Sequence, residues 1–189
     1  ISGFLHWTAL RDQQVVRQEK DFSCGLAALA TVLTYYFERP VSEAQLLDQL
    51  DLPDSQTLAR QLAREGLPLT ERERLQSLRE RGVSLALLAR LARTHGLRAR
   101  GVSLRPESLS RLSMPAIAYV EPGGAPHFTL IRGVDQRGRV QVADPSWGNR
   151  LFPADDFARI FAPRGAQAGR LLLLLPGDAA SPASDWFRI

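Results

Sequence analysis

The spacing of apolar residues changes halfway along this 189-residue chain. In the first half, apolar residues recur at helical spacing, which predicts helices over 24–37, 43–50 and 84–95. The second half carries short apolar runs, which predict strands over 97–104, 116–121, 127–134, 139–143 and 170–175, and one short helix over 153–161. Helices first and antiparallel strands later predict an α+β fold.

The length of the chain favours a single domain, spanning residues 1–189, with a sizeable core. The stretch 54–81 is helical in composition and rich in both charges, so we interpret it as a helical insertion in that domain. Residues 176–189 are rich in Ala, Ser and Pro, which predicts a short C-terminal tail. Residues 1–17 have a mixed composition, and we expect a partly extended lead-in there.

The chain is basic, with a net charge of +4 and a pI of about 10.0. Its basic side chains are nearly all arginine, with Lys20 the only lysine, and they are interleaved with acidic residues. Without a basic cluster or a recognisable motif, we expect no nucleic-acid partner. We also expect no transmembrane segment, because the leucine run 171–175 is far short of the roughly 20 residues that a span requires.

The only cysteine of the chain, Cys24, stands where a helix is expected to begin. A thiol at that position faces unpaired backbone N–H groups and the positive end of the helix dipole, and both favour the reactive thiolate. Gly25 leaves room for a substrate backbone beside the sulfur. Gln18 lies six residues upstream, where its amide could help the backbone N–H of Cys24 hold an oxyanion. The alternative interpretation is a buried structural cysteine.

A cysteine nucleophile needs a base, and His127 is the best candidate among the histidines. It follows a glycine-rich turn and begins a predicted strand, and a histidine at such a strand end can face a cleft while the core holds the strand. His95 fits the last turn of a helix instead, where a histidine favours the helix dipole. His6 falls in the N-terminal segment of mixed composition.

An aspartate, Asp144, ends the next predicted strand. If the two strands form a hairpin about residues 136–138, their far ends are neighbours, so Asp144 can orient the imidazole of His127. The alternative is that Asp144 only starts a turn. Asp135 is a weaker competitor because it stands at the opposite end of the hairpin. Trp147 could shield the contact from water or serve as a core aromatic.

No cluster of metal-ligand residues is visible, and the sequence has neither a CxxC nor an HExxH motif. We therefore expect no metal and no nucleotide cofactor.

Three segments together resemble the bacteriocin-processing double-glycine cysteine peptidase family, whose domains are papain-like. They are QEKDFSCGLAALAT (18–31), HFTLIRGV (127–134) and VADPSWGN (142–149). The resemblance implies a papain-like fold, with the nucleophile at a helix start packed on a C-terminal antiparallel sheet. It implies Cys24 as nucleophile, His127 as general base, Asp144 as orienting acid and Gln18 as oxyanion-hole residue. The chain departs from exporter domains at Ser23, where those commonly have Asp.

The resemblance also implies a substrate. Family members cut leader peptides after small residues, often Gly-Gly, so the expected substrate is a peptide or protein precursor. Residues 82–101 resemble a stand-alone branch without a transporter, and part of that branch belongs to functional-amyloid secretion systems. This implies a periplasmic location, with the cytoplasm as the alternative, and other secretion-system components as partners.

Two other functions remain open on the same fold. The domain could be a catalytically quiet binding or chaperone module that holds a secreted or amyloid precursor during export. It could also be a related acyl-transfer enzyme. Alkylation of Cys24 separates the quiet module from the two enzymes, and the mass of the product separates hydrolysis from transfer.

Overall fold

The computed structural model describes residues 7–51 and 83–177. The predicted insertion at 54–81, residues 178–189 of the predicted tail and His6 lie outside the described residues. The helices are α1 (Trp7–Asp12), α2 (Cys24–Tyr35), α3 (Glu43–Asp48), α6 (Leu85–Thr94) and α7 (Ala154–Phe161). Short 3-10 helices follow α3 (Gln49–Asp51) and β1 (Pro106–Arg111).

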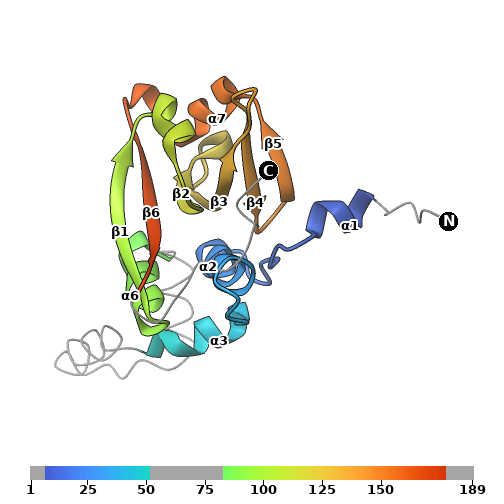
Figure 1. Ribbon diagram of the computed structural model, residues 1–189, viewed down its shortest axis with the longest axis vertical. Coiled ribbons are helices and arrows are strands. Elements are labelled where there is room, and N and C mark those ends of the chain that lie inside the picture. Colours follow the sequence, from blue (N-terminus) through green and yellow to red (C-terminus); the bar gives the residue numbers. More distant parts are fainter. Residues whose placement is uncertain (1–6, 52–82, 178–189) are drawn as a thin grey trace.

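The strands form one six-stranded antiparallel sheet in the order β1-β6-β2-β3-β4-β5 (Figure 1). They are β1 (Leu97–Leu104), β2 (Ala116–Val120), β3 (His127–Val134), β4 (Val140–Asp144), β5 (Gly148–Phe152) and β6 (Gly169–Pro176). The predicted α+β architecture is confirmed, with helices early in the chain and an antiparallel sheet after them.

The sheet has an apolar core on each face, because its strands alternate between the two. On one face, Leu130 and Leu172 pack with α2, α3 and α6, whose buried faces include Leu29, Leu46 and Leu88. On the other face, Phe157 and Phe161 of α7 pack against β2, β4 and β6. In Figure 1, α2 and α6 lie at the lower end of the sheet and α7 at its upper end. This packing fixes the start of α2 against the start of β3.

Local sequence signals set the helix starts. The side chain of Ser42 accepts from the backbone N–H of Gln45, while the Gln45 side chain accepts from the N–H of Ser42. The predicted capping box is therefore present. The side chain of Ser84 caps α6 by accepting from the backbone N–H of Leu87. The left-handed φ of Gly96 (74°) ends the helix, as predicted for a glycine just after a helix.

Two elements differ from the sequence predictions at the N-terminal side of the molecule. Residues 7–12 form α1, where a partly extended lead-in was expected. Strand β5 was not predicted, because GNRLF does not alternate between polar and apolar residues. The two elements support each other, since Asn149 of β5 donates to the carbonyls of Leu10 (3.1 Å) and Gln13 (2.7 Å).

The hairpin between β3 and β4 forms as predicted. Its turn is closed by Asp135, whose carboxylate accepts from the backbone N–H groups of Arg137 and Arg139. These bonds lower the pKa of Asp135, the one to the Arg139 N–H most of all. Asp135 is thus a turn residue, which leaves the far end of the hairpin to His127 and Asp144.

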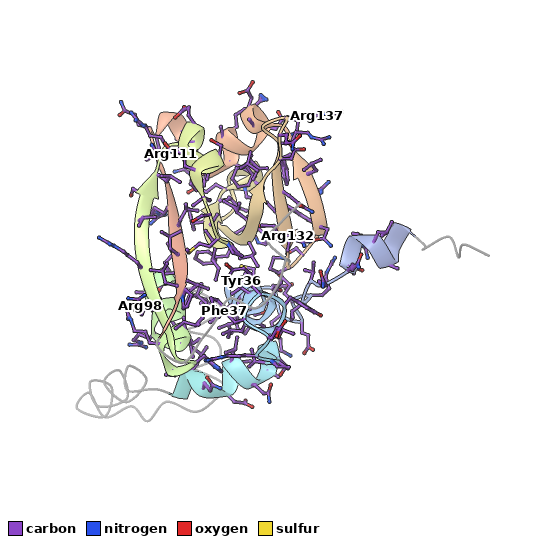
Figure 2. The ribbon with its side chains drawn as sticks, in the orientation of Figure 1. Tyr36, Phe37, Arg98, Arg111, Arg132 and Arg137 are labelled. Atoms are coloured by element: carbon purple, nitrogen blue, oxygen red, sulfur yellow. The ribbon has the colours of Figure 1, made fainter. Side chains whose placement is uncertain are left out.

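Basic residues are spread over the described surface. Figure 2 shows Arg98, Arg111 and Arg137 at well-separated places, on β1, after β1 and on the β3–β4 turn. In the described part of the chain, no helix combines the length and the apolar character needed to cross a membrane.

Candidate active site

Cys24 is the first residue of α2 and is 8% exposed. The preceding residue, Ser23, does not cap the helix with its side chain. Its hydroxyl turns back and donates to the carbonyl of Lys20 (2.7 Å). The N–H groups of the first turn therefore carry no side-chain cap from Ser23, and the positive end of the helix dipole lies at the Cys24 thiol.

His127 is the first residue of β3, and its Nε2 lies 2.9 Å from Oδ2 of Asp144, the last residue of β4. Asp144 is 1% exposed. Its second oxygen, Oδ1, accepts from the backbone N–H groups of Ser146 (2.8 Å) and Trp147 (2.9 Å). Three hydrogen bonds therefore fix the carboxylate, which in turn fixes the imidazole.

The same contacts change the proton affinity of His127. Burial lowers the pKa of His127, but its hydrogen bonds and Coulombic interactions with Asp144 and Cys24 outweigh burial and raise the pKa to about 9. Burial raises the pKa of Asp144, but its hydrogen bonds to His127 and to neighbouring groups lower it by more. The pKa of Asp144 therefore lies below its ordinary value. The protonated imidazole is thus stabilised between a carboxylate and the sulfur. Since Nε2 lies on Asp144, Nδ1 is the ring nitrogen that can face Cys24.

Gln18 lies beside the turn that carries Asp144. Its backbone N–H donates to the carbonyl of Pro145 (3.1 Å), and its side-chain Oε1 accepts from the hydroxyl of Ser146 (2.8 Å). Its Nε2 donates to the carbonyl of Lys20 (3.1 Å), just upstream of Cys24. An amide nitrogen carries two hydrogens, so one N–H remains for another acceptor.

Gly25 has a different role from the one expected. A Cβ at Gly25 would lie 3.0 Å from Leu88 Cδ1, 3.2 Å from Phe128 Cδ2 and 3.4 Å from Val83 Cγ1. The space beside this backbone is therefore filled by the protein core, not kept open for a substrate. The glycine lets the start of α2 approach β3 and α6 closely.

Trp147 lies against the imidazole of His127, as expected if it shields the His127–Asp144 contact from water. The ring centroids of Trp147 and His127 are 5.4 Å apart, with a tilt of 41°. Trp147 is 38% exposed, so it covers one side of His127 while keeping a face of its own open to solvent.

Sequence reasoning missed the contribution of Ser146, whose hydroxyl bonds to Gln18 across a separation of 128 residues. A signal was present, because Ser146 stands two residues after Asp144 in the same turn. Only the docking of the segment before α2 against that turn gives the serine its partner, and this is a tertiary contact that local patterns do not carry.

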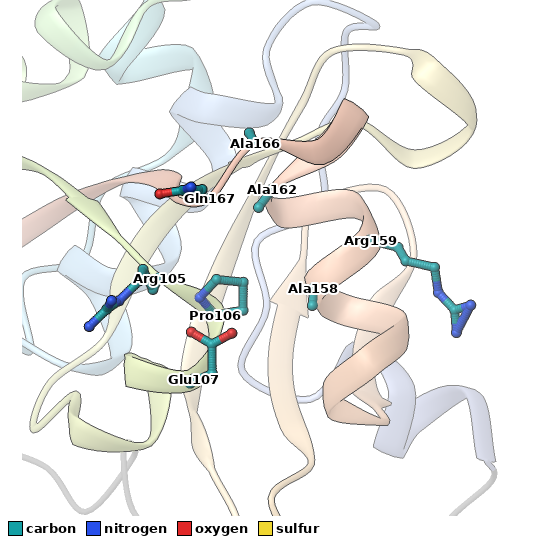
Figure 3. Close-up of a pocket in the computed structure, with 8 residues that line it drawn as sticks. All are labelled: Arg105, Pro106, Glu107, Ala158, Arg159, Ala162, Ala166 and Gln167. Atoms are coloured by element: carbon teal, nitrogen blue, oxygen red, sulfur yellow. The ribbon is translucent and has the colours of Figure 1, made fainter.

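The described residues also line a hollow in another part of the molecule, between α7 and the 3-10 helix after β1. Its volume is about 650 Å³. Figure 3 shows Arg105 and Glu107 across from Ala158 and Ala162. Its lining includes no nucleophile and no histidine. This lining lacks the thiol and the imidazole that Cys24 and His127 bring to the candidate site.

Solved structures share this fold. A double glycine motif protease from an AMS/PCAT transporter, solved in complex with its leader peptide, superposes with a TM-score of 0.55 at 21% identity, covering 86% of this chain and 90% of that one. The peptidase domain of Streptococcus ComA superposes with a TM-score of 0.57 at 17% identity, covering 86% and 97%. At these identities the likeness concerns the fold.

Curated sequences are more similar. The probable functional amyloid proteases FapD of Pseudomonas fluorescens and Pseudomonas aeruginosa are 29% and 30% identical over 78% and 79% of this chain. The chain spans only 56% and 57% of the length of these relatives. An uncharacterized protein of Methanothermobacter thermautotrophicus is 33% identical, covering 84% of this chain and 89% of its own.

The family assignment rests on a broader match. The model of the peptidase C39 family matches residues 12–66 and 64–165, which is most of the chain. The resemblance to double-glycine cysteine peptidases predicted from the three motifs is thereby confirmed. This chain belongs to the peptidase C39 family, a family of cysteine peptidases.

Proposed function

We propose that this chain hydrolyses one peptide bond in a secreted precursor or leader peptide, after small residues such as Gly-Gly. The observation that carries the proposal is the series Cys24–His127–Asp144, in which a buried carboxylate and a thiol at a helix start hold one imidazole between them. A thiolate paired with an imidazolium is the form in which a cysteine attacks a carbonyl.

The proposed reaction has two steps. The Cys24 thiolate attacks the scissile carbonyl, His127 gives its proton to the leaving amine, and the carbon–nitrogen bond breaks to leave an acyl-enzyme. Water, deprotonated by His127, then attacks the thioester and releases the acid and the thiol. Asp144 keeps the imidazole oriented through both steps and stabilises its charged form.

The backbone N–H of Cys24 and the side chain of Gln18 are the proposed oxyanion donors. Two bonds support Gln18 in this role, because they hold its amide between the Asp144 turn and the loop before α2. A donor held in advance loses little entropy when the negative charge forms.

The relatives support the choice of substrate. Two of them are probable functional amyloid proteases, and one solved structure of this fold is a double glycine motif protease with its leader peptide. We infer that the substrate is a secreted precursor, that the enzyme works in the periplasm, and that other secretion-system components deliver the precursor to it.

The deciding experiment is the pH dependence of Cys24 alkylation by iodoacetamide, read by intact mass, in the wild type and in His127→Ala. Because the pKa of His127 is raised to about 9, its proton stays on the ring through neutral pH, and an imidazolium beside a thiol favours the reactive form of the sulfur. We expect fast labelling below pH 7 in the wild type and its loss in the variant. Slow labelling in both, following an ordinary thiol with a pKa of about 8.5, would contradict the proposal and favour a quiet binding module.

A peptide assay completes the test. A Gly-Gly peptide is incubated with the wild type, and the products are identified by mass. Two fragments whose masses sum to the peptide plus water indicate hydrolysis, whereas a fragment joined to an added amine indicates acyl transfer.

A further inference from the structure

We propose that Arg150 binds an acidic side chain of the substrate, in the segment that follows the cut. The inference rests on the proposed function, because it takes Cys24 and His127 as the groups that act on the scissile bond. It adds to that function a positively charged residue, Arg150, that recognises the part of the substrate released as the leaving amine.

Aromatic rings hold Arg150 in place. Its guanidinium carbon lies 5.3 Å from the ring centroid of Trp147 and 5.7 Å from that of Phe152. Phe152 is itself anchored edge-on to the buried Phe157 of α7, at 5.9 Å. A guanidinium that lies over aromatic faces keeps its N–H groups at the edge, where they remain available to a carboxylate.

The charge of Arg150 is not used by its surroundings. Arg150 is exposed, and no carboxylate of the described residues forms an ion pair with it. Some other described arginines differ in this respect, since Arg17, Arg139 and Arg159 are paired with Asp12, Asp135 and Asp156. A guanidinium that is oriented by rings and lacks a carboxylate partner is suited to an external anion.

The position of Arg150 relative to the reacting atoms identifies that anion. His127 must protonate the leaving amine, so the residues after the cut lie on the His127 side of the sulfur. The Trp147 ring borders His127 at 5.4 Å and Arg150 at 5.3 Å, so it forms a continuous surface from one to the other. An extended peptide advances about 3.3 Å per residue, which brings its second or third residue after the cut to Arg150.

The chemistry of the contact favours Asp or Glu at that place. A carboxylate can take two parallel N–H donors from one guanidinium, whereas a lysine side chain would be repelled. The site is exposed, so we expect a preference of about 2- to 5-fold, as for a charge pair near the surface. The preference should weaken at high salt, because exposed charges are screened.

The test compares two peptides that carry Gly-Gly before the cut and either Glu or Lys at the second and third positions after it. The ratio of kcat/KM for the Glu peptide over the Lys peptide is measured in the wild type, Arg150→Gln, Arg150→Glu and Arg111→Gln. We expect the ratio to be high in the wild type and in Arg111→Gln, close to one in Arg150→Gln, and inverted in Arg150→Glu. A wild-type ratio of one, or a ratio unchanged in Arg150→Gln, would overturn the proposal.

A binding measurement separates this proposal from the proposed function. The two peptides are titrated into Cys24→Ala and into Cys24→Ala combined with Arg150→Gln, and their Kd values are compared. If the Glu peptide binds more tightly and this difference disappears with Arg150→Gln, the contact with Arg150 is supported. This holds even if the wild type cuts neither peptide, a result that would contradict only the proposed peptidase activity. Equal Kd values in Cys24→Ala would contradict the role of Arg150.

Discussion

The segment from Asp144, the last residue of β4, to Phe152, the last residue of β5, has two halves whose side chains are held by different forces. Before Gly148, Asp144 and Ser146 are fixed by short hydrogen bonds to His127 and Gln18, and Asp144 is 1% exposed. After Gly148, the exposed side chain of Arg150 lies against the rings of Trp147 and Phe152. Hydrogen bonds fix atoms to within fractions of an ångström, which proton transfer requires, whereas stacking leaves a charge accessible. The difference teaches that one short segment can serve chemistry at one end and recognition at the other.

The largest effect should come from Cys24→Ala, which removes the chemistry and leaves recognition intact. We expect no product at all, because no other described side chain of the site can form the acyl-enzyme. The fold should persist, since a small residue is tolerated at a helix start. Product mass and circular dichroism check both points. Unchanged turnover in this variant would show that Cys24 is not the nucleophile.

The next effect concerns the amide of Gln18. Gln18→Ala should lower kcat by about 10²-fold, the typical loss for one oxyanion donor. Gln136→Ala, in the exposed β3–β4 turn, is the matched control and should leave kcat unchanged. A wild-type kcat in Gln18→Ala would remove Gln18 from the site. Because Gln18 belongs to the hydrogen-bonded half, the Glu-to-Lys preference attributed to Arg150 should survive.

These residues also show how far local patterns reach. Cys24, His127 and Asp144 could be predicted because each stands at the end of an element whose period is visible in the sequence, and a hairpin brings the last two together. Strand β5 could not, because GNRLF lacks a strand pattern and Asn149 docks on the end of α1, a contact with a segment far away in the sequence. Gly25 was misinterpreted for the same reason, because its neighbours Leu88 and Phe128 come from distant segments.

The junction of the two halves gives a stability prediction. Gly148 has φ 80°, and a Cβ there would lie 2.5 Å from the carbonyl oxygen of Arg11. Gly148→Ala should therefore lower the free energy of unfolding by about 1–3 kcal/mol from the backbone conformation alone. Urea denaturation measures it.

The control for that prediction is Gly101→Ala on β1. No atom lies within 4 Å of a Cβ at Gly101, and its φ is not in the left-handed region. This variant should be neutral or slightly more stable, because alanine restricts the unfolded chain. If both variants lost the same stability, neither the left-handed φ of Gly148 nor its close approach to Arg11 would be the cause.

The smallest effect tests whether the hydrogen-bonded half acts as one unit. Ser146→Ala removes the bond to Gln18 Oε1 but leaves the backbone N–H of Ser146 on Asp144, so the His127–Asp144 pair should stay intact. We expect a fall in kcat of several-fold, up to about 10-fold, the value of one neutral hydrogen bond. The pH profile of Cys24 alkylation should not change, because it reports the imidazole and not the amide.

A double-mutant cycle makes this test specific. If Ser146 acts by orienting Gln18, Ser146→Ala should lower kcat in the wild type and have almost no further effect in Gln18→Ala. If the serine only supports the turn, the two effects should multiply, and the alkylation profile should shift as Asp144 loses its position. The cycle thus distinguishes a serine that positions the oxyanion donor from one that merely closes the turn. Arg150→Gln should be additive with Ser146→Ala and with Gln18→Ala, because Arg150 lies on the other side of Gly148. This additivity would show that the two halves of the segment act independently.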